Sequence, residues 1–212
     1  VLVNGLRAQE AQKVSAPDHI LLDGREIDQG QPGVPVVLAF NKPRGMVCTS
    51  SKRDRAPNII DHIGYGSHIF PIGRLDKDSE GLILLTNMGE LVNRVNRGRF
   101  EHEKEYEVRV SRDIDRDFAD RLEAGVMIEV PDRGRVRARC RRAEITGRRS
   151  LRIVLTEGMN RQIRRMCGAL GARVIELRRV RVMNIRLGSL APGSYRMLEG
   201  AELEELLREA GI

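Results

Sequence analysis

The residue of this sequence best suited to chemistry is Asp76, which lies between the basic residues Arg74 and Lys77. Glycines at Gly73 and Gly81 allow the chain to turn tightly on either side and to bring its backbone close to a ligand. A carboxylate in a partly dry pocket stays ionised when a guanidinium or ammonium group lies beside it. Such a group can serve as a nucleophile. We expect Asp76 to carry the chemistry, and closure of a turn is the structural alternative.

A second cluster of basic residues follows a turn at Gly158 and falls on a predicted helix. We expect Asn160 to cap this helix. Its apolar stripe at helical spacing consists of Ile163, Met166, Cys167 and Leu170. Arg161, Arg164 and Arg165 project from roughly the opposite side, where they repel one another unless an anionic partner compensates. A solvated basic face is the alternative.

Three strings of the sequence together resemble the RsuA-type RNA pseudouridine synthases. Residues 70–87, FPIGRLDKDSEGLILLTN, are similar to the segment that holds the family's catalytic aspartate. Residues 156–167 resemble the Gln-Ile-Arg segment, which implies that Arg164 pairs with Asp76. Residues 102–106, HEKEY, resemble the tyrosine segment, which implies that Tyr106 stacks on the target uracil and assists proton transfer. Without the family, Tyr106 is an ordinary core aromatic.

The resemblance implies an isomerase that detaches uracil from the ribose of a uridine in RNA, rotates it and rejoins it through C5. No atom is gained from outside, so we expect no cofactor, including no nucleotide cofactor, and no metal. The target nucleotide must be flipped out of folded RNA, and Arg74 matches the family residue that fills the gap. The other residues expected to contact RNA are Lys42, Lys77, Lys104, Arg161 and Arg165; of these, Lys42 is either positional or phosphate-facing.

The resemblance covers nearly all of residues 34–198 and is strongest for a subgroup that acts on the large ribosomal subunit. We therefore expect 23S ribosomal RNA as the partner, with a transfer RNA as the alternative, and a monomeric enzyme. A non-catalytic RNA-binding protein of ribosome assembly is a competing interpretation. Another is a phosphodiester-cleaving enzyme with Asp76 and Asp78 as a metal-binding pair, for which Asp-x-Asp is a weak signal.

Composition agrees with an RNA-handling protein. Lys and Arg total 37 against 30 Asp and Glu, which gives a net charge of +7 and an isoelectric point near 9.8. Of the basic residues 32 are Arg and five are Lys, a bias that suits phosphate binding and that a GC-rich genome would also produce. The three cysteines and four histidines show no disulfide or zinc spacing. No apolar run is long enough for a membrane span or resembles a signal peptide, so we expect a cytoplasmic protein.

The chain organisation predicts two domains. Residues 1–33 resemble the C-terminal part of an S4-like RNA-binding domain followed by a linker at 29–33, with the opening helices lost upstream. Residues 34–212 form the catalytic domain, an α+β fold with a mixed, largely antiparallel sheet flanked by helices. Strands are expected at 1–4, 20–22, 36–40, 82–85, 104–110, 135–145 and 151–156 and within 173–187, and helices at 88–97, 115–124 and 201–210.

Overall fold

The computed structural model describes residues 1–10, 12–15, 18–26, 34–48, 56–96, 101–131 and 133–212. The chain divides into two compact units, Val1–Pro35 and Val36–Ile212. In the described ranges, every helix is too short or too polar to cross a lipid bilayer. The predicted linker at 29–33 lies outside the described residues.

The first unit is a small antiparallel sheet of four strands in the order β2-β1-β3-β4. These strands are β1 (Leu2–Val3), β2 (Leu6–Arg7), β3 (Ile20–Leu22) and β4 (Arg25–Glu26). The side chain of Asn4 ties its two hairpins together, since it donates to Asp18 and accepts from the backbone of His19, both at 2.8 Å. The strands expected at 1–4 and 20–22 are confirmed. The S4-like character of this unit stays a prediction.

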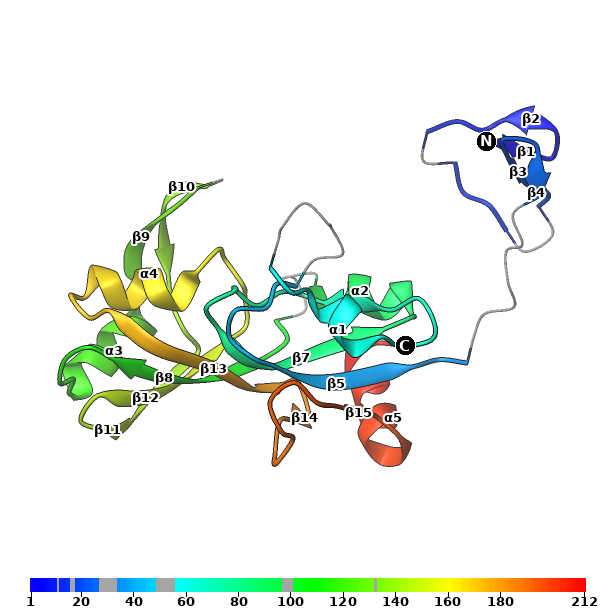
Figure 1. The fold of residues 1–212 in the computed structure, drawn as a ribbon. Coiled ribbons are helices and arrows are strands. Elements are labelled where there is room, and N and C mark those ends of the chain that lie inside the picture. Colours follow the sequence, from blue (N-terminus) through cyan, green and yellow to red (C-terminus); the bar gives the residue numbers. More distant parts are fainter. Residues whose placement is uncertain (11, 16–17, 27–33, 49–55, 97–100, 132) are drawn as a thin grey trace. The chain divides into compact units, whose positions relative to one another are not determined.

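The second unit is built on a nine-stranded sheet whose main path runs β11-β12-β8-β13-β7-β5-β15 (Figure 1). β14 pairs with β13, and β6 pairs with β7. Only β13 and β7 are parallel neighbours, so the described sheet is mixed and largely antiparallel, as predicted. The strands are β5 (Val37–Lys42), β6 (Phe70–Ile72), β7 (Glu80–Thr86), β8 (Lys104–Val110), β11 (Arg142–Gly147), β12 (Ser150–Leu155), β13 (Val174–Val182), β14 (Ile185–Arg186) and β15 (Tyr195–Met197).

Both faces of this sheet are covered, because alternate residues of β5 and β7 point to opposite sides. Leu38 and Ile83 enter one core, together with α1, α3, α4 and the separate hairpin of β9 and β10. Ala39 and Leu84 enter the other core, together with α2 and α5. The remaining elements are α1 (Ile59–Ile63), α2 (Gly89–Asn96), α3 (Arg116–Ala124), β9 (Val126–Val130), β10 (Gly134–Ala138), α4 (Gln162–Ala169) and α5 (Gly200–Ala210).

The parallel pairing of β7 and β13 depends on Gly81. Its Cα lies opposite that of Arg179 in the register, and its φ is +103°, a value that suits glycine. A Cβ at this position would lie 2.2 Å from the carbonyl oxygen of Arg179. The glycine after the Asp76 loop therefore permits β13 to approach β7 closely.

Two elements differ from the sequence prediction. The single strand expected at 135–145 is wrong: β10 and β11 belong to different sheets, and between them the amide of Cys140 donates to the carbonyl of Leu122 at 3.1 Å. The expected cap by Asn160 is also wrong, because α4 has Arg161 as its N-cap in a left-handed conformation. Periodicity cannot reveal either feature, since the break and the cap are set by contacts distant in sequence.

The helix expected at 88–97 is α2, which begins at Gly89 and ends at Asn96. Residue 97 lies outside the described residues. Asn87, just before this helix, accepts a hydrogen bond from the backbone of Val36 at 2.9 Å. Its side chain thereby links the start of α2 to the segment that enters β5.

Candidate active site

Asp76 lies in the loop that connects β6 to β7, as the sequence predicts. The loop is held by its own backbone, since the amide of Ser79 donates to the carbonyl of Asp76 at 3.0 Å, and by the segment after β5, since Gly45 donates to Lys77 at 2.7 Å. The side chain of Asp76 is 29% exposed. The loop backbone at Asp76 is therefore fixed, and its carboxylate is still reachable from outside.

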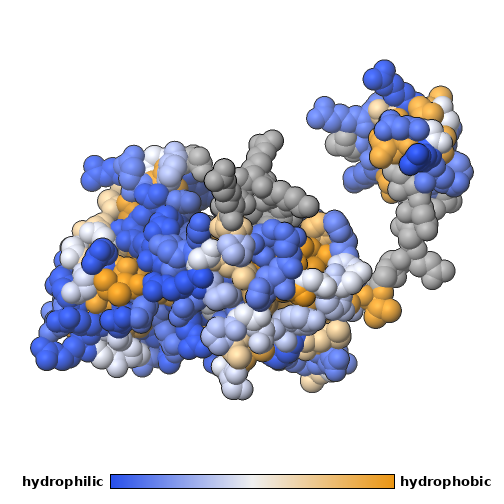
Figure 2. All heavy atoms as spheres, viewed as in Figure 1, coloured by the Kyte–Doolittle hydropathy of each residue, from blue (hydrophilic) through white to orange (hydrophobic). Residues whose placement is uncertain are grey.

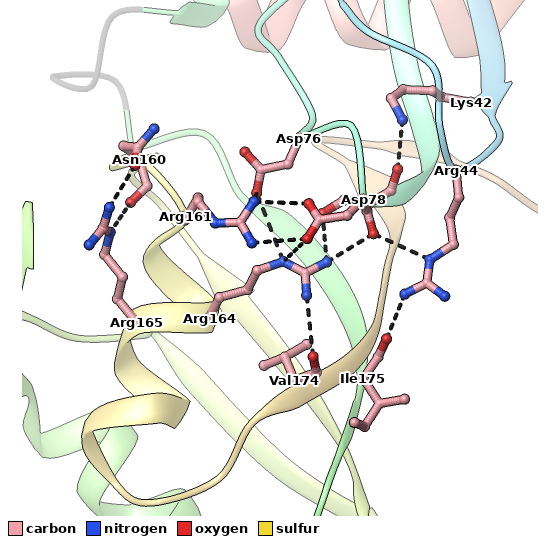
Figure 3. Close-up of polar contacts among 11 residues, drawn as sticks. Lys42, Arg44, Asp76, Asp78, Asn160, Arg161, Arg164, Arg165, Val174 and Ile175 are labelled. Atoms are coloured by element: carbon pink, nitrogen blue, oxygen red, sulfur yellow. Dashed lines mark hydrogen bonds and ion pairs between the residues drawn. The ribbon is translucent and has the colours of Figure 1, made fainter. Parts of the chain in front are cut away.

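Two arginines of the α4 segment point toward this loop (Figure 3). Nη1 of Arg161 lies 3.6 Å from Oδ2 of Asp76, and the same guanidinium donates two hydrogen bonds of 2.9 Å to Asp78. Nε of Arg164 lies 4.0 Å from Oδ2 of Asp76 and 3.5 Å from Oδ2 of Asp78. Asp76 therefore faces two guanidinium groups, and Arg161, expected only to contact RNA, is the nearer of them.

Arg164 also supports the backbone of the loop at Asp78 and Ser79. Its guanidinium donates to the carbonyl of Asp78 at 2.9 Å and to the hydroxyl of Ser79 at 3.2 Å. Its Nε is buried and has no hydrogen-bond partner among the described residues. Arg44 adds a second donor to the carbonyl of Asp78, at 3.3 Å, and also donates to Ile175. The loop is thus attached to α4, to β13 and to the segment after β5.

The ion pairs shift the acidity of the groups around Asp76. The hydrogen bonds from Arg161 lower the pKa of Asp78, and the same bonds raise the pKa of Arg161. Burial lowers the pKa of the Arg164 guanidinium from a very high ordinary value, so it keeps its charge near neutral pH. Asp76 therefore lies in a field of two permanent positive charges.

Two hollows meet at Asp76. The larger, of about 1030 Å³, is lined by Arg74 and Lys77 on the loop and by Arg44. The smaller, of about 640 Å³, is lined by Tyr106. Arg74, Asp76 and Arg161 line both hollows. The smaller hollow has the size of a site for a small molecule or a single nucleotide.

The smaller hollow also receives side chains from β8 and from the residues before it. Tyr106 is 8% exposed and lies in an alternating strand whose buried residues include Val108 and Val110. Lys104 donates to the carbonyl of His102 at 3.1 Å. Burial, with a smaller contribution from Arg179, lowers the pKa of Lys104 to about 8. Burial also lowers the pKa of His102.

The other predicted RNA-contacting residues have different surroundings. Lys42 is completely buried and donates to the carbonyls of Pro43, at 3.0 Å, and Ser79, at 2.7 Å. The phosphate-facing alternative requires an exposure that Lys42 lacks, and its contacts are those of a positional residue. Arg165 points away from the two aspartates and donates twice to Asn160, at 3.0 Å (Figure 3).

Sequence reasoning missed three contributors: Asp78 as the holder of Arg161, Arg44 as a support of the loop, and Arg179 in the wall of the smaller hollow. The Asp-x-Asp spacing was visible but suggested a metal site. Both carboxylate oxygens of Asp78 accept from Arg161, so a guanidinium occupies the position that a cation shared with Asp76 would need. In the described part of the chain, no cluster of three metal-ligating side chains occurs.

Comparison with known proteins gives concordant results. Residues 36–169 match the model of a family described as RNA pseudouridylate synthase. The chain is 42% identical to a Salmonella typhi protein named dual-specificity RNA pseudouridine synthase RluF and 40% identical to the protein of that name from Escherichia coli K12. Each alignment covers 98% of this chain and 70% of the relative. A crystal structure of a pseudouridylate synthase superposes with a TM-score of 0.75 at 26% identity, covering 96% of this chain and 87% of the other.

Proposed function

This chain belongs to the RNA pseudouridylate synthase family and is an enzyme that isomerises uridine in RNA, and from that premise we propose that Asp76 is the nucleophile of the reaction. The observation that carries this proposal is the place of Asp76: a partly exposed carboxylate at the junction of two hollows, 3.6 Å from Arg161 and 4.0 Å from Arg164. Two guanidinium groups fixed beside it supply positive charge at the point where the ribose is attacked.

The chemistry follows from a carboxylate at that point. An oxygen of Asp76 attacks C1′ of the target ribose, the C1′–N1 bond breaks, and its electron pair leaves with the base. The base then rotates, C5 attacks C1′, and the ester bond to Asp76 breaks. Loss of the proton on C5 and protonation of N1 complete an isomerisation with no net change of atoms, so the proposal includes no cofactor.

The two hollows divide the substrate between them. The smaller one receives the uridine, with Tyr106 stacking on the base and assisting removal of the C5 proton. The larger one follows the RNA strand, where Lys77 and Arg44 meet phosphates. A uridine reaches the smaller hollow only when it leaves its stack, and Arg74, exposed at the rim of both hollows, fills the space left behind.

Two relatives carry the name dual-specificity RNA pseudouridine synthase. We therefore assign this chain two RNA substrates, and 23S ribosomal RNA and a transfer RNA are the candidates. The net charge of +7 supports binding to either polyanion. Unit Val1–Pro35, as an S4-like segment, would add RNA affinity without taking part in the chemistry. A monomer in the cytoplasm completes the proposal.

The decisive experiment replaces Asp76 by Asn. This change removes the nucleophile while keeping the size of the side chain, so we expect pseudouridine formation in 23S and transfer RNA to fall by more than about 10⁴-fold, with RNA affinity retained. Asp113→Asn is the matched control, because Asp113 pairs with Arg148 and Arg149 on the surface. Turnover by the Asp76 variant would refute the nucleophile, and an inactive wild type would favour a non-catalytic RNA-binding protein.

A further inference from the structure

Arg179 is a buried cation in the wall of the smaller hollow. It lies on β13, its residue is 3% exposed, and its Nε donates to the carbonyl of Leu82 at 2.7 Å. Its Nη2 is buried and has no hydrogen-bond partner among the residues that the structure describes. Leaving such a donor unpaired inside a protein is costly, so an acceptor that reached this atom would remove that cost.

The backbone places Arg179 beside the predicted stacking residue. In the antiparallel register of β13 and β8, Arg179 lies opposite Tyr106, and directly opposed side chains share a face of the sheet. On its other side, β13 lies against β7 at Gly81, where any side chain would strike the backbone of Arg179. The hydrogen bond to Leu82 therefore fixes the guanidinium within the wall of the hollow that Tyr106 also lines.

The charges of the smaller hollow are unbalanced. Its wall holds five basic residues, namely Arg74, His102, Lys104, Arg161 and Arg179, against the carboxylates of Asp76 and Glu157. Asp78 engages Arg161, and Gln162 donates to Glu157 at 3.1 Å. In the described ranges, neither Lys104 nor Arg179 forms an ion pair with a carboxylate. A hollow that keeps one buried and one half-buried cation without a carboxylate partner is suited to an anion.

We propose that Arg179, with Lys104 beside it, binds the detached uracil as its anion and stabilises the charge that the base carries while it is separated from the ribose. This inference rests on the proposed function and deepens it. When the C1′–N1 bond breaks, the electron pair left on N1 spreads to O2 and O4 of the ring. Donors fixed before the reaction stabilise such developing charge without having to reorganise.

Arg179 and Lys104 would also keep the detached base in the hollow. Asp76 is covalently occupied at this stage and holds the sugar alone. The uracil anion is held by the positive charges of Arg179 and Lys104 and by stacking on the ring of Tyr106. Attraction between charges allows the uracil to rotate more readily than a set of directional hydrogen bonds would. The inference therefore concerns the interval between cleavage and rejoining.

The test compares cleavage of the glycosidic bond in saturating RNA that carries uridine or 5-fluorouridine at the target position. Fluorine makes the base more acidic and hence a better leaving group that needs less help from the protein. With uridine, Arg179→Gln should lower the single-turnover rate by about 10²-fold, and the RNA dissociation constant should stay within about twofold. With 5-fluorouridine, the loss should shrink to about tenfold or less.

Matched variants distinguish stabilisation of the uracil anion by the charge of Arg179 from structural support of the site by its side chain. Arg178→Gln changes the neighbouring arginine, which lines another hollow with Glu80 and Glu107, and should leave both rates within about twofold. Arg179→Lys keeps the charge and should recover part of the uridine rate. Lys104→Met should show the same dependence on the leaving group, and it carries the test if Arg179→Gln does not fold.

Two results would overturn the inference. Equal losses with both bases would mean that Arg179 only supports Tyr106, and weaker RNA binding with an unchanged rate would make it a phosphate contact. Either result would leave the proposed function intact, because that function fails only if the wild type forms no pseudouridine or if Asp76→Asn retains turnover.

Discussion

Asp78 accepts two hydrogen bonds of 2.9 Å from Arg161, whereas Asp76, two residues earlier, lies 3.6 Å from the same guanidinium. The two carboxylates therefore have different relations to one cation. Asp78 uses both carboxylate oxygens to hold Arg161 in place. Asp76 lies close enough to interact electrostatically with Arg161 but forms no hydrogen bond to it. A nucleophile arranged in this way keeps its lone pairs for the substrate.

We predict that Asp78→Asn lowers turnover and strengthens RNA binding at the same time. The change releases Arg161 from its charged partner and raises the net charge by one. The single-turnover rate should fall about tenfold because Arg161 is no longer fixed beside Asp76, and the dissociation constant at low salt should fall by about two- to threefold. Filter binding and rapid-quench kinetics measure the two quantities.

Asp113→Asn adds the same charge at a surface site and is the control for this prediction. It should tighten RNA binding slightly or not at all and should leave the rate unchanged. An Asp78 variant with normal turnover would contradict the role given to the Arg161–Asp78 pair.

Arg165 and Arg161 should separate RNA binding from catalysis. The described contacts of the Arg165 side chain are two hydrogen bonds to Asn160, so Arg165→Ala should weaken binding, reduce the slope of log K against log salt by about 1 and preserve the rate at saturation. Arg161→Ala should instead lower the rate at saturation, because it removes the cation nearest Asp76. Titrations at several salt concentrations, each paired with single-turnover assays, distinguish the two effects.

Gly81→Ala should destabilise the protein severely. The new methyl group would lie 2.2 Å from the carbonyl oxygen of Arg179, so β7 and β13 would have to separate, and we expect a loss of about 3 kcal/mol or more in the free energy of unfolding. Gly168→Ala is the matched control: it lies within α4 with open space around it and should stabilise the helix by about 0.5–1 kcal/mol. Urea unfolding of both variants checks the contrast.

Lys104→Met should make the protein more stable and less active. The pKa of Lys104 is about 8 in the folded protein against an ordinary value of 10.5, so the buried charge weakens the folded state below pH 8, by at most about 3 kcal/mol. Between pH 8 and 10.5 the unfolded chain binds more protons than the folded one, and wild-type stability should rise with pH. Chemical denaturation of both proteins at pH 7 and pH 10 should show the difference narrowing.

The sequence predicted well those elements whose pattern is local. The strand expected at 104–110 is β8, and the helical stripe of Ile163 and Met166 is buried as expected. The site loop was located by the resemblance of residues 70–87 to the family segment that holds the catalytic aspartate, because the neighbours of Asp76 alone are equally consistent with closure of a turn. These features depend on residues close together in the chain.

What the sequence could not predict depends on contacts between distant segments. The preference of Arg161 for Asp78 spans 83 residues, and the pairing of Arg179 with Tyr106 arises from strand order. The sequence left Lys42 as either positional or phosphate-facing, and the burial of β5 along its whole length depends on strands and helices distant in the chain. The break between β10 and β11 likewise depends on α3, whose residue Leu122 accepts the hydrogen bond.

The position of β13 between β8 and β7 determines when the cleft can form. The ribosome makes β7 and β8 first, and the strand that must lie between them is synthesised last, ending at Val182. A growing chain that has already exposed the loop of Asp76 still lacks the strand that joins the two halves of the sheet. The two halves of the sheet are therefore joined around the Asp76 loop only after translation has passed Val182.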